Sequence, residues 1–329
     1  HGIEVIYLGY HRSARDIARA AIQEDVRAIG ISSYNGGHVE FFSEVITLLR
    51  KENAKHIRVF GGGGGTISKA DAAVMSRRGV DRIFFAGTRF DEMIRFVKER
   101  YGRPLATPSR EEIVHRLTRK SSGDRRRRPA LVIGIGGPGG VGKTTLIDEL
   151  VLRFLRTDKA RRIAILSHDP SAPGKGALLG DRAAMIYSQD DRVFVRSLAT
   201  RGTTGGLSPE TGPWLRTLKR AEIDIVLIET VGIGQEALPF PRDLVDQRIF
   251  VMSPDYGSRL QLQKIVMLDS ADLIVLNKAD APNARTARSE VEQRLGLNAR
   301  GQRLVGTIAN RHRDAGVDEL FSWLQQIPE

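Results

Sequence analysis

Residues 131–146 read LVIGIGGPGGVGKTTL, in which a run of strand-forming residues gives way to a glycine-rich turn and then to Gly-Lys-Thr. Within this stretch, residues 137–144 fit the pattern G-x-x-x-x-G-K-[ST] in full, and an amphipathic run follows to about Leu155. Glycines let successive backbone N–H groups turn toward phosphate oxygens, because no Cβ stands in the way. The helix that follows points its positive end at the same place. The stretch therefore predicts a strand, a turn and a helix that together bind nucleotide phosphates.

Each part of this motif has an expected partner on the nucleotide. Lys143 is expected to reach the β- and γ-phosphates and to assist catalysis, and the Thr144 hydroxyl to bind Mg²⁺. A glycine-rich turn without a ligand is the alternative, and the strand–turn–helix context disfavours it. The residues expected to contact the nucleotide here are Gly139, Gly140, Val141, Gly142, Lys143, Thr144 and Thr145.

Composition restricts the classes of protein that fit. The chain has 329 residues, of which 41% are hydrophobic and 27% charged, as in soluble globular proteins with room for two domains. It has no cysteine, which excludes disulfides and thiolate metal sites, and no apolar run long enough to span a membrane. We expect a cytoplasmic protein without a membrane partner. The net charge of +12 suggests nucleic acid, but the dense basic run at 125–128 lacks aromatic residues and favours a solvated linker.

A base-binding pattern follows an apolar strand expected at 273–276. It consists of Asn277-Lys-Ala-Asp280, in which the Asp280 carboxylate can accept hydrogen bonds from the N1–H and the exocyclic amine of guanine. Asn277 would fix the loop, and the stem of Lys278 would cover the base. A surface turn is the alternative reading of this tetrapeptide. Together with the phosphate motif, the pattern predicts GTP as the ligand.

Acidic residues that could hold the metal lie at other expected strand ends. Asp169, Asp181 and Glu229 are placed to do so with Thr144, although a local ion pair is an alternative role for Asp181. Gly232 ends the segment that begins at Glu229, and its N–H could bind the γ-phosphate and so switch a loop. Ile233 stands where Ras-like GTPases carry a glutamine that orients water. Glu229 and Gln235 are therefore the candidate catalytic residues beside Lys143.

The first part of the chain alternates expected strands (3–8, 27–32, 57–60, 82–85) with expected helices (13–24, 39–51, 68–78, 90–101). Such alternation predicts a parallel sheet with helices on both faces and ligands at the carboxyl ends of the strands. Two of these ends are distinctive: residues 32–38 read SSYNGGH, and residues 61–65 are five consecutive glycines. The glycines would let a large flat group lie against the backbone, and a flexible loop without a ligand is the alternative.

These residues resemble the cobalamin-binding domain of adenosylcobalamin-dependent acyl-CoA mutases, which has a flavodoxin-like (Rossmann-like) fold. The resemblance implies that Ser32, Gly61 and Gly62 line the slot for the dimethylbenzimidazole tail. Tyr34 replaces the leucine usual in that family, so the shape of the slot could differ. The D-x-H-x-x-G motif that supplies the cobalt ligand is absent, and His1 is not its equivalent. We therefore expect the natural chain to begin before His1, or its ligand region to be missing from the sequence.

The second part of the chain resembles the MeaB/ArgK-type G-protein chaperones of cobalamin mutases. The resemblance is carried, in one order, by segments 169–171, 178–182, 196–200, 229–235 and 277–280. It implies metal ligands at Thr144, Asp169, Asp181 and Glu229, with Thr230 beside them. Segment 173–176 departs from the pattern in a loop of variable composition, and Ala184 stands where close relatives carry an arginine near the phosphates. The order of the two domains is that of fused isobutyryl-CoA mutases, in which a mutase barrel follows.

The sequence thus predicts an α/β protein with three segments: a flavodoxin-like cobalamin-binding domain (1–103), a linker (104–128) and a P-loop GTPase domain with a mostly parallel sheet (129–329). The expected cofactors are GTP or GDP, Mg²⁺ and adenosylcobalamin. We expect GTP to gate cofactor loading of an acyl-CoA mutase, in cis or in trans, within a homodimer. The alternatives are a stand-alone chaperone of a separate mutase, a non-catalytic nucleotide-sensing adaptor, and a GTPase associated with nucleic acid.

Overall fold

The computed structural model describes residues 2–34, 36–102, 109–118, 129–232, 240–256, 266–296 and 301–327, of which the side chains of 115–118 are not included. The chain forms two compact units. The first contains residues 1–3 and 8–119, and the second contains residues 4–7 and 120–329. The linker expected at 104–128 falls mostly outside the described residues, except for helix α5 (Arg110–Thr118), which contacts helix α1 in the first unit.

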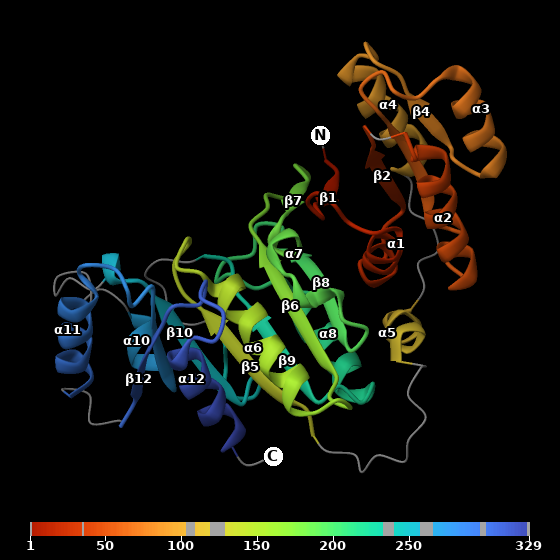
Figure 1. Cartoon of the computed structure of the whole chain (residues 1–329). Helices are drawn as coiled ribbons and strands as arrows, with labels where there is room; N and C mark the ends of the chain where they lie inside the picture. The colour runs from red at the N-terminus through yellow and green to blue at the C-terminus, as the bar shows by residue number, and fades with distance from the viewer. Residues whose placement is uncertain are drawn as a thin grey trace. The chain divides into compact units, whose positions relative to one another are not determined.

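The first unit is a three-stranded parallel sheet flanked by helices (Figure 1). The strand order is β2-β3-β4, and residues Ile31 and Ser32 lie opposite Gly61 and Gly62. The alternation of strands and helices in the sequence correctly predicted this class of fold. The elements are β2 (Ala28–Ser32), β3 (Arg58–Gly62), β4 (Arg82–Phe84), α1 (Ala14–Gln23), α2 (His38–Lys51), α3 (Lys69–Arg78) and α4 (Phe90–Tyr101).

Two groups of apolar side chains cover the two faces of this sheet. One is a mainly aliphatic core that also contains Phe42 of α2, and α1 and α2 bury it against the strands. The other is an aromatic cluster, in which the rings of Phe60 and Tyr101 stack at 5.5 Å and Phe96 meets Tyr101 edge to face at 5.8 Å. Serine N-caps with reciprocal aspartate bonds begin α1 and α3, which fixes where these helices start.

The second unit is built on a seven-stranded parallel sheet of order β12-β11-β10-β5-β9-β6-β8. Strands of its interior, such as β5, β9 and β11, are buried on both faces, as expected for a parallel sheet with near-continuous apolar runs. The strands are β5 (Leu131–Gly136), β6 (Ile163–Asp169), β8 (Val193–Ala199), β9 (Ile225–Glu229), β10 (Gln247–Met252), β11 (Leu273–Asn277) and β12 (Arg303–Thr307).

Helices cover this sheet and place its loops. Odd-numbered strand residues such as Ile133 and Ile165 form one core with Leu150 of α6 and Leu320 of α12. The ring of Phe194, at an even-numbered position, packs against Trp214 of α8 at 5.8 Å. The remaining elements are α6 (Lys143–Thr157), α7 (Asp181–Ala184), η1 (Tyr187–Gln189), α8 (Thr211–Arg220), η2 (Pro254–Tyr256), α10 (Val266–Ser270), α11 (Ala284–Gly296) and α12 (Ala315–Gln325).

One expected strand lies in a different sheet from the one predicted. Residues 3–8 were expected to join the first sheet, but β1 (Glu4–Ile6) pairs in parallel with β7 (Ala177–Leu179) and belongs to the second unit. An extended pattern shows that a segment can pair, but it does not identify the partner strand. No helix in the described parts of the chain is both long and apolar enough to cross a membrane.

Candidate functional site

The glycine-rich turn lies between β5 and α6, where the sequence predicted it. Gly142 precedes the helix with φ of 92°, a left-handed conformation that suits glycine. The Lys143 side chain is 7% exposed, and its Nζ donates to the carbonyl oxygens of Gly137 and Pro138 at 3.0 and 3.1 Å. Burial lowers the pKa of Lys143, while the charges of Glu229 and Asp181 act in the opposite direction. The lysine is thus held inside the turn.

Thr144 contacts the carboxylate of Glu229 at the end of β9, and Ser167 links that carboxylate to Asp181, which begins helix α7 and does not lie at a strand end as expected. Its Oγ1 donates to Glu229 Oε1 at 2.7 Å, and Ser167 Oγ of β6 lies 2.5 Å from Asp181 Oδ2 and 3.2 Å from Glu229 Oε2. Complete burial, followed by the charge of Asp181, raises the pKa of Glu229 to about 8. The carboxylates of Asp181 and Glu229 both contact the Ser167 hydroxyl, so their negative charges repel each other, and a proton or a bound cation would relieve this repulsion. Ser167 was not predicted from the sequence, because a single serine in an apolar strand belongs to no motif that would indicate a functional role.

The oxygen atoms gathered around Ser167 are suitable ligands for a divalent cation. Carboxylate and hydroxyl oxygens are the ligands that Mg²⁺ prefers, and Thr144, Asp181 and Glu229 supply them. The Oγ1 atom of Thr230 is buried, and no partner for it lies within the described part of the chain. Asp169 Oδ2 accepts from the Gly180 N–H at 3.2 Å. Among the residues described, no cluster of three or more His, Cys, Asp or Glu forms a metal site of protein ligands alone, so phosphate oxygens or water would have to complete the coordination.

The segment that begins at Glu229 passes against the phosphate loop. Thr230 N donates to Ile135 O at 3.0 Å, and a Cβ added at Gly232 would lie 2.6 Å from the backbone of Gly139. Only glycine therefore fits at position 232 without a shift of the backbone. Gln235, the candidate for orienting water, lies outside the described residues.

A single amide joins the phosphate end of the site to the base end. Asn277 is 3% exposed, and its Nδ2 donates to Val141 O at 2.8 Å. Its Oδ1 accepts from Thr307 Oγ1 and from the Ala309 N–H, both at 3.0 Å. The base-side loop after β12 is thus fastened to the phosphate loop. Sequence reasoning assigned the role of Asn277 but missed the partners Thr307 and Ala309.

The other two residues of the base-binding pattern lie at the surface. Lys278 has φ of 59°, and its Nζ donates to Gly140 O at 2.8 Å, so its stem spans the edge of the phosphate loop. Asp280 Oδ2 pairs with Arg311 Nη2 at 3.3 Å, and the Asp280 side chain is 43% exposed. A guanine bound to Asp280 would have to displace or share this arginine.

In the first unit, the strand register brings the three expected cobalamin contacts together. Ser32 ends β2, is exposed, and lies opposite Gly62 at the end of β3. Close neighbours in the protein already require glycine here. A Cβ added at Gly61 would lie 2.1 Å from Ile31 O, and one added at Gly62 would lie 2.5 Å from Phe84 O. These glycines keep the strand ends free of side chains, as a flat ligand requires, but they would be needed without a ligand too.

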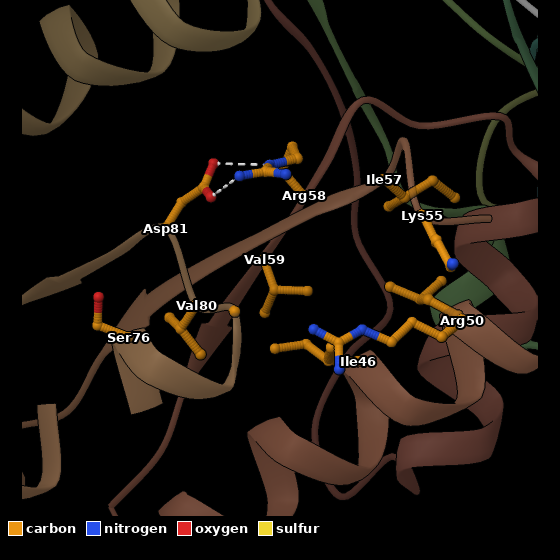
Figure 2. A pocket seen from close by; sticks show the side chains of 11 residues that line it. Ile46, Arg50, Lys55, Ile57, Arg58, Val59, Ser76, Val80 and Asp81 are labelled. Carbon is orange, nitrogen blue, oxygen red and sulfur yellow. Dashed lines mark hydrogen bonds and ion pairs between the residues drawn. The ribbon is translucent and has the colours of Figure 1, made fainter. Parts of the chain in front are cut away.

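A cavity of about 450 Å³ lies at the opposite, amino-terminal end of these strands (Figure 2). Its lining mixes apolar residues, such as Val59 and Val80, with charged ones. Arg58 forms hydrogen bonds with both carboxylate oxygens of Asp81, and Arg50 donates to Arg78 O at 3.1 Å. Both arginines are therefore already engaged, and the cavity is separate from the expected cobalamin contacts.

Comparisons with known proteins match both units. Residues 1–94 match the B12 binding domain family, and residues 102–327 match the family described as Methylmalonyl Co-A mutase-associated GTPase MeaB. Two proteins named Fused isobutyryl-CoA mutase, from Geobacillus kaustophilus and Cupriavidus metallidurans, are 37% and 36% identical over 97% and 98% of this chain. The chain spans about a third (33%) of the length of each.

Among solved structures, HypB from Helicobacter pylori in complex with nickel gives a TM-score of 0.45 at 16% identity, over 60% of this chain and 86% of that one. The match to the GTPase family covers well over half of the residues. The chain therefore belongs to the MeaB family of methylmalonyl-CoA mutase-associated GTPases.

Proposed function

We propose that this chain binds and hydrolyses GTP, and that the nucleotide state gates the loading or release of adenosylcobalamin at an acyl-CoA mutase. The observation that carries the proposal is the contact of Thr144 with Glu229, which Ser167 links to Asp181 beside the phosphate loop, in a chain whose first residues match a B12 binding domain. The mutase would be a further domain of the same protein or a separate one. Isomerisation of isobutyryl-CoA and n-butyryl-CoA by that mutase is part of the proposal; the names of the two relatives support isobutyryl-CoA as a substrate.

Each residue of the nucleotide site has a proposed task. Lys143 would leave the carbonyls of Gly137 and Pro138 and neutralise the β- and γ-phosphates. Thr144, Asp181 and Glu229 would hold Mg²⁺, with Asp169 and Thr230 close by. When bound, Mg²⁺ supplies positive charge to the phosphates. Asp280 would select guanine, and the Gly232 N–H would report whether the γ-phosphate is present. Glu229 and Gln235 stay the proposed catalytic groups.

Nucleotide binding is tested by fluorescence titration of the full chain with labelled GTP and labelled ATP. GTP should bind at least ~100-fold more tightly, because the Asp280 carboxylate can accept hydrogen bonds from the N1–H and the exocyclic amine of guanine, which adenine cannot offer in that arrangement. Lys143→Ala should abolish binding, and Asp280→Asn should weaken GTP alone. Lys159→Ala and Asp91→Asn, which change exposed residues elsewhere, serve as controls. Equal affinity for ATP, or normal GTP affinity in Lys143→Ala, would contradict the site assignment.

Cobalamin binding is tested separately by absorption titration with adenosylcobalamin. Ser32→Phe adds bulk at an exposed strand end without filling the core, so it should block binding through Ser32, Gly61 and Gly62. Absence of binding by the unaltered chain would favour the nucleotide-sensing adaptor. The homodimer and the cytoplasmic location stay predictions, and light scattering and cell fractionation test them.

A further inference from the structure

His168 is a buried polar residue to which the proposed function assigns no task. It is the next-to-last residue of β6 and is 2% exposed. Its Nδ1 lies 2.7 Å from the carbonyl oxygen of Glu229, and its Nε2 lies 2.7 Å from Thr211 Oγ1 at the start of α8. One imidazole therefore joins the ends of two strands and a helix.

The partners assign the protons on this ring. A carbonyl oxygen can only accept, so Nδ1 carries a hydrogen and donates it to Glu229 O. Burial lowers the pKa of His168 to about 4, so the ring is neutral near pH 7 and Nε2 is an acceptor. The Thr211 hydroxyl has one hydrogen, which it can donate to Nε2 at 2.7 Å or to Ser208 O at 2.6 Å. Ser208 O also receives the Thr211 N–H at 3.0 Å.

The carbonyl that His168 holds is the starting point of the segment facing the phosphates. After Glu229, Val231 N donates to Gly206 O at 3.2 Å. The loop between β8 and α8 therefore contacts the segment directly through Gly206 and indirectly through Thr211 and His168. The position of the Glu229 backbone determines where its carboxylate and the later Gly232 N–H point.

The beginning of the same loop is tied to the other acidic strand end. Thr200 N donates to Asp169 O at 3.1 Å, and Thr200 Oγ1 accepts from Ser171 N at 3.1 Å. Gly202 N donates to Ser171 O at 2.7 Å. The loop thus connects the Asp169 end of β6 with the Glu229 end of β9, and His168 lies between them.

We propose that His168 is a positioning residue for GTP hydrolysis, which fixes the segment from Glu229 to Gly232 against the loop between β8 and α8 without touching the nucleotide. This inference rests on the proposed GTPase site. GDP has no γ-phosphate for Gly232 to contact, so its affinity should depend little on His168, whereas the rate of hydrolysis should depend on it.

The test compares kcat for GTP and Kd for labelled GDP in the full chain and its variants. His168→Leu keeps an apolar side chain of useful volume but removes the donor, and kcat should fall about tenfold while Kd for GDP stays within about threefold. His168→Asn keeps an N–H near the position of Nδ1, so it should restore most of the lost rate. Thr211→Val removes the second contact and should lower kcat in the same direction. Thr217→Val, another buried threonine of α8 whose hydroxyl donates to Pro213 O, is the matched control and should leave kcat unchanged.

The outcomes separate the inference from the proposed function. Normal kcat in His168→Leu, or equal losses in His168→Leu and His168→Asn, would overturn the positioning role. If His168→Leu does not fold, Thr211→Val decides: a lowered kcat with unchanged GDP affinity supports the inference, and an unchanged kcat refutes it. Failure of the unaltered chain to bind or hydrolyse GTP would instead refute the proposed function.

Discussion

Replacement of Asn277 by alanine would test how firmly the two ends of the nucleotide site are joined. The change removes three hydrogen bonds and leaves Val141 O, the Ala309 N–H and the Thr307 hydroxyl without the partner they have now. Each buried polar group left unpaired costs ~1 kcal/mol or more, so the free energy of unfolding should fall by about 3 to 5 kcal/mol. For a domain of about 200 residues, that predicts a thermal midpoint ~6 °C lower or more.

Differential scanning calorimetry of the nucleotide-free full chain measures this change. Asn310→Ala removes an exposed amide from the same loop and should move the midpoint by less than about 1 °C, since surface changes usually stay within ±0.5 kcal/mol. Asn277→Asp is a second comparison, because it keeps the acceptor for Ala309 but turns an oxygen toward Val141 O. A shift below about 2 °C in Asn277→Ala would mean that these bonds are replaced by others, and the reasoning would be wrong.

Three further predictions concern single positions. Gly142→Ala places a side chain at a residue with φ of 92°, and its Cβ would lie 2.5 Å from Asn277 Nδ2. Titration with GTP should therefore show at least ~10-fold weaker binding, and an unchanged affinity would contradict this prediction. Glu229 has a raised pKa of about 8, so between its unfolded pKa and pH 8 the folded state holds a proton that the unfolded state releases, and stability falls as pH rises. With chelator present, the thermal midpoint of Glu229→Gln should therefore rise relative to the unaltered protein between pH 6 and 9, and a constant difference would contradict this. The pKa of Asp81 is lowered, because its hydrogen bonds and ion pair with Arg58 outweigh the opposing effect of burial. The stability that the Asp81 carboxylate contributes is therefore present at pH 7 and lost in acid. Thermal unfolding followed by circular dichroism should show Asp81→Asn to be less stable than the unaltered protein at pH 7, with a smaller difference in stability below pH 4.

Local patterns predicted most of the fold because they depend on neighbours in the sequence. The phosphate turn, the strand that ends at Asn277 and helix α2 lie where apolar periodicity and glycines placed them. The pairing of β1 was predicted wrongly, since a strand of three largely exposed residues has no pattern that selects a partner. Strands β7 and β12 were not recognised: β7 has only three residues, and β12 (RLVGT) lacks the continuous apolar run of the strands beside it.

The candidate site was predictable only where a residue belongs to a contiguous motif. Thr144 and Asn277 are in such motifs, whereas Ser167 and His168 acquire their contacts from strands and helices far away in sequence. A buried serine and histidine in an apolar strand look like ordinary core residues until the sheet order is known. The sequence also predicted Asp280 as an acceptor but could not indicate that Arg311 pairs with it.

The glycine run of the first unit has a consequence for how this lineage can change. At Gly61, Gly62 and Gly63, an added Cβ would meet backbone oxygens at 2.1, 2.5 and 2.0 Å, and backbone cannot move aside as a side chain can. At Gly64 the obstacle is the exposed ring of Tyr34, which can rotate away. Relatives that do not bind cobalamin would therefore still need glycine at positions 61–63, whereas position 64 could accept other residues. Variation at position 64 together with 34, with 61–63 unchanged, is therefore the pattern of change that backbone packing alone would permit.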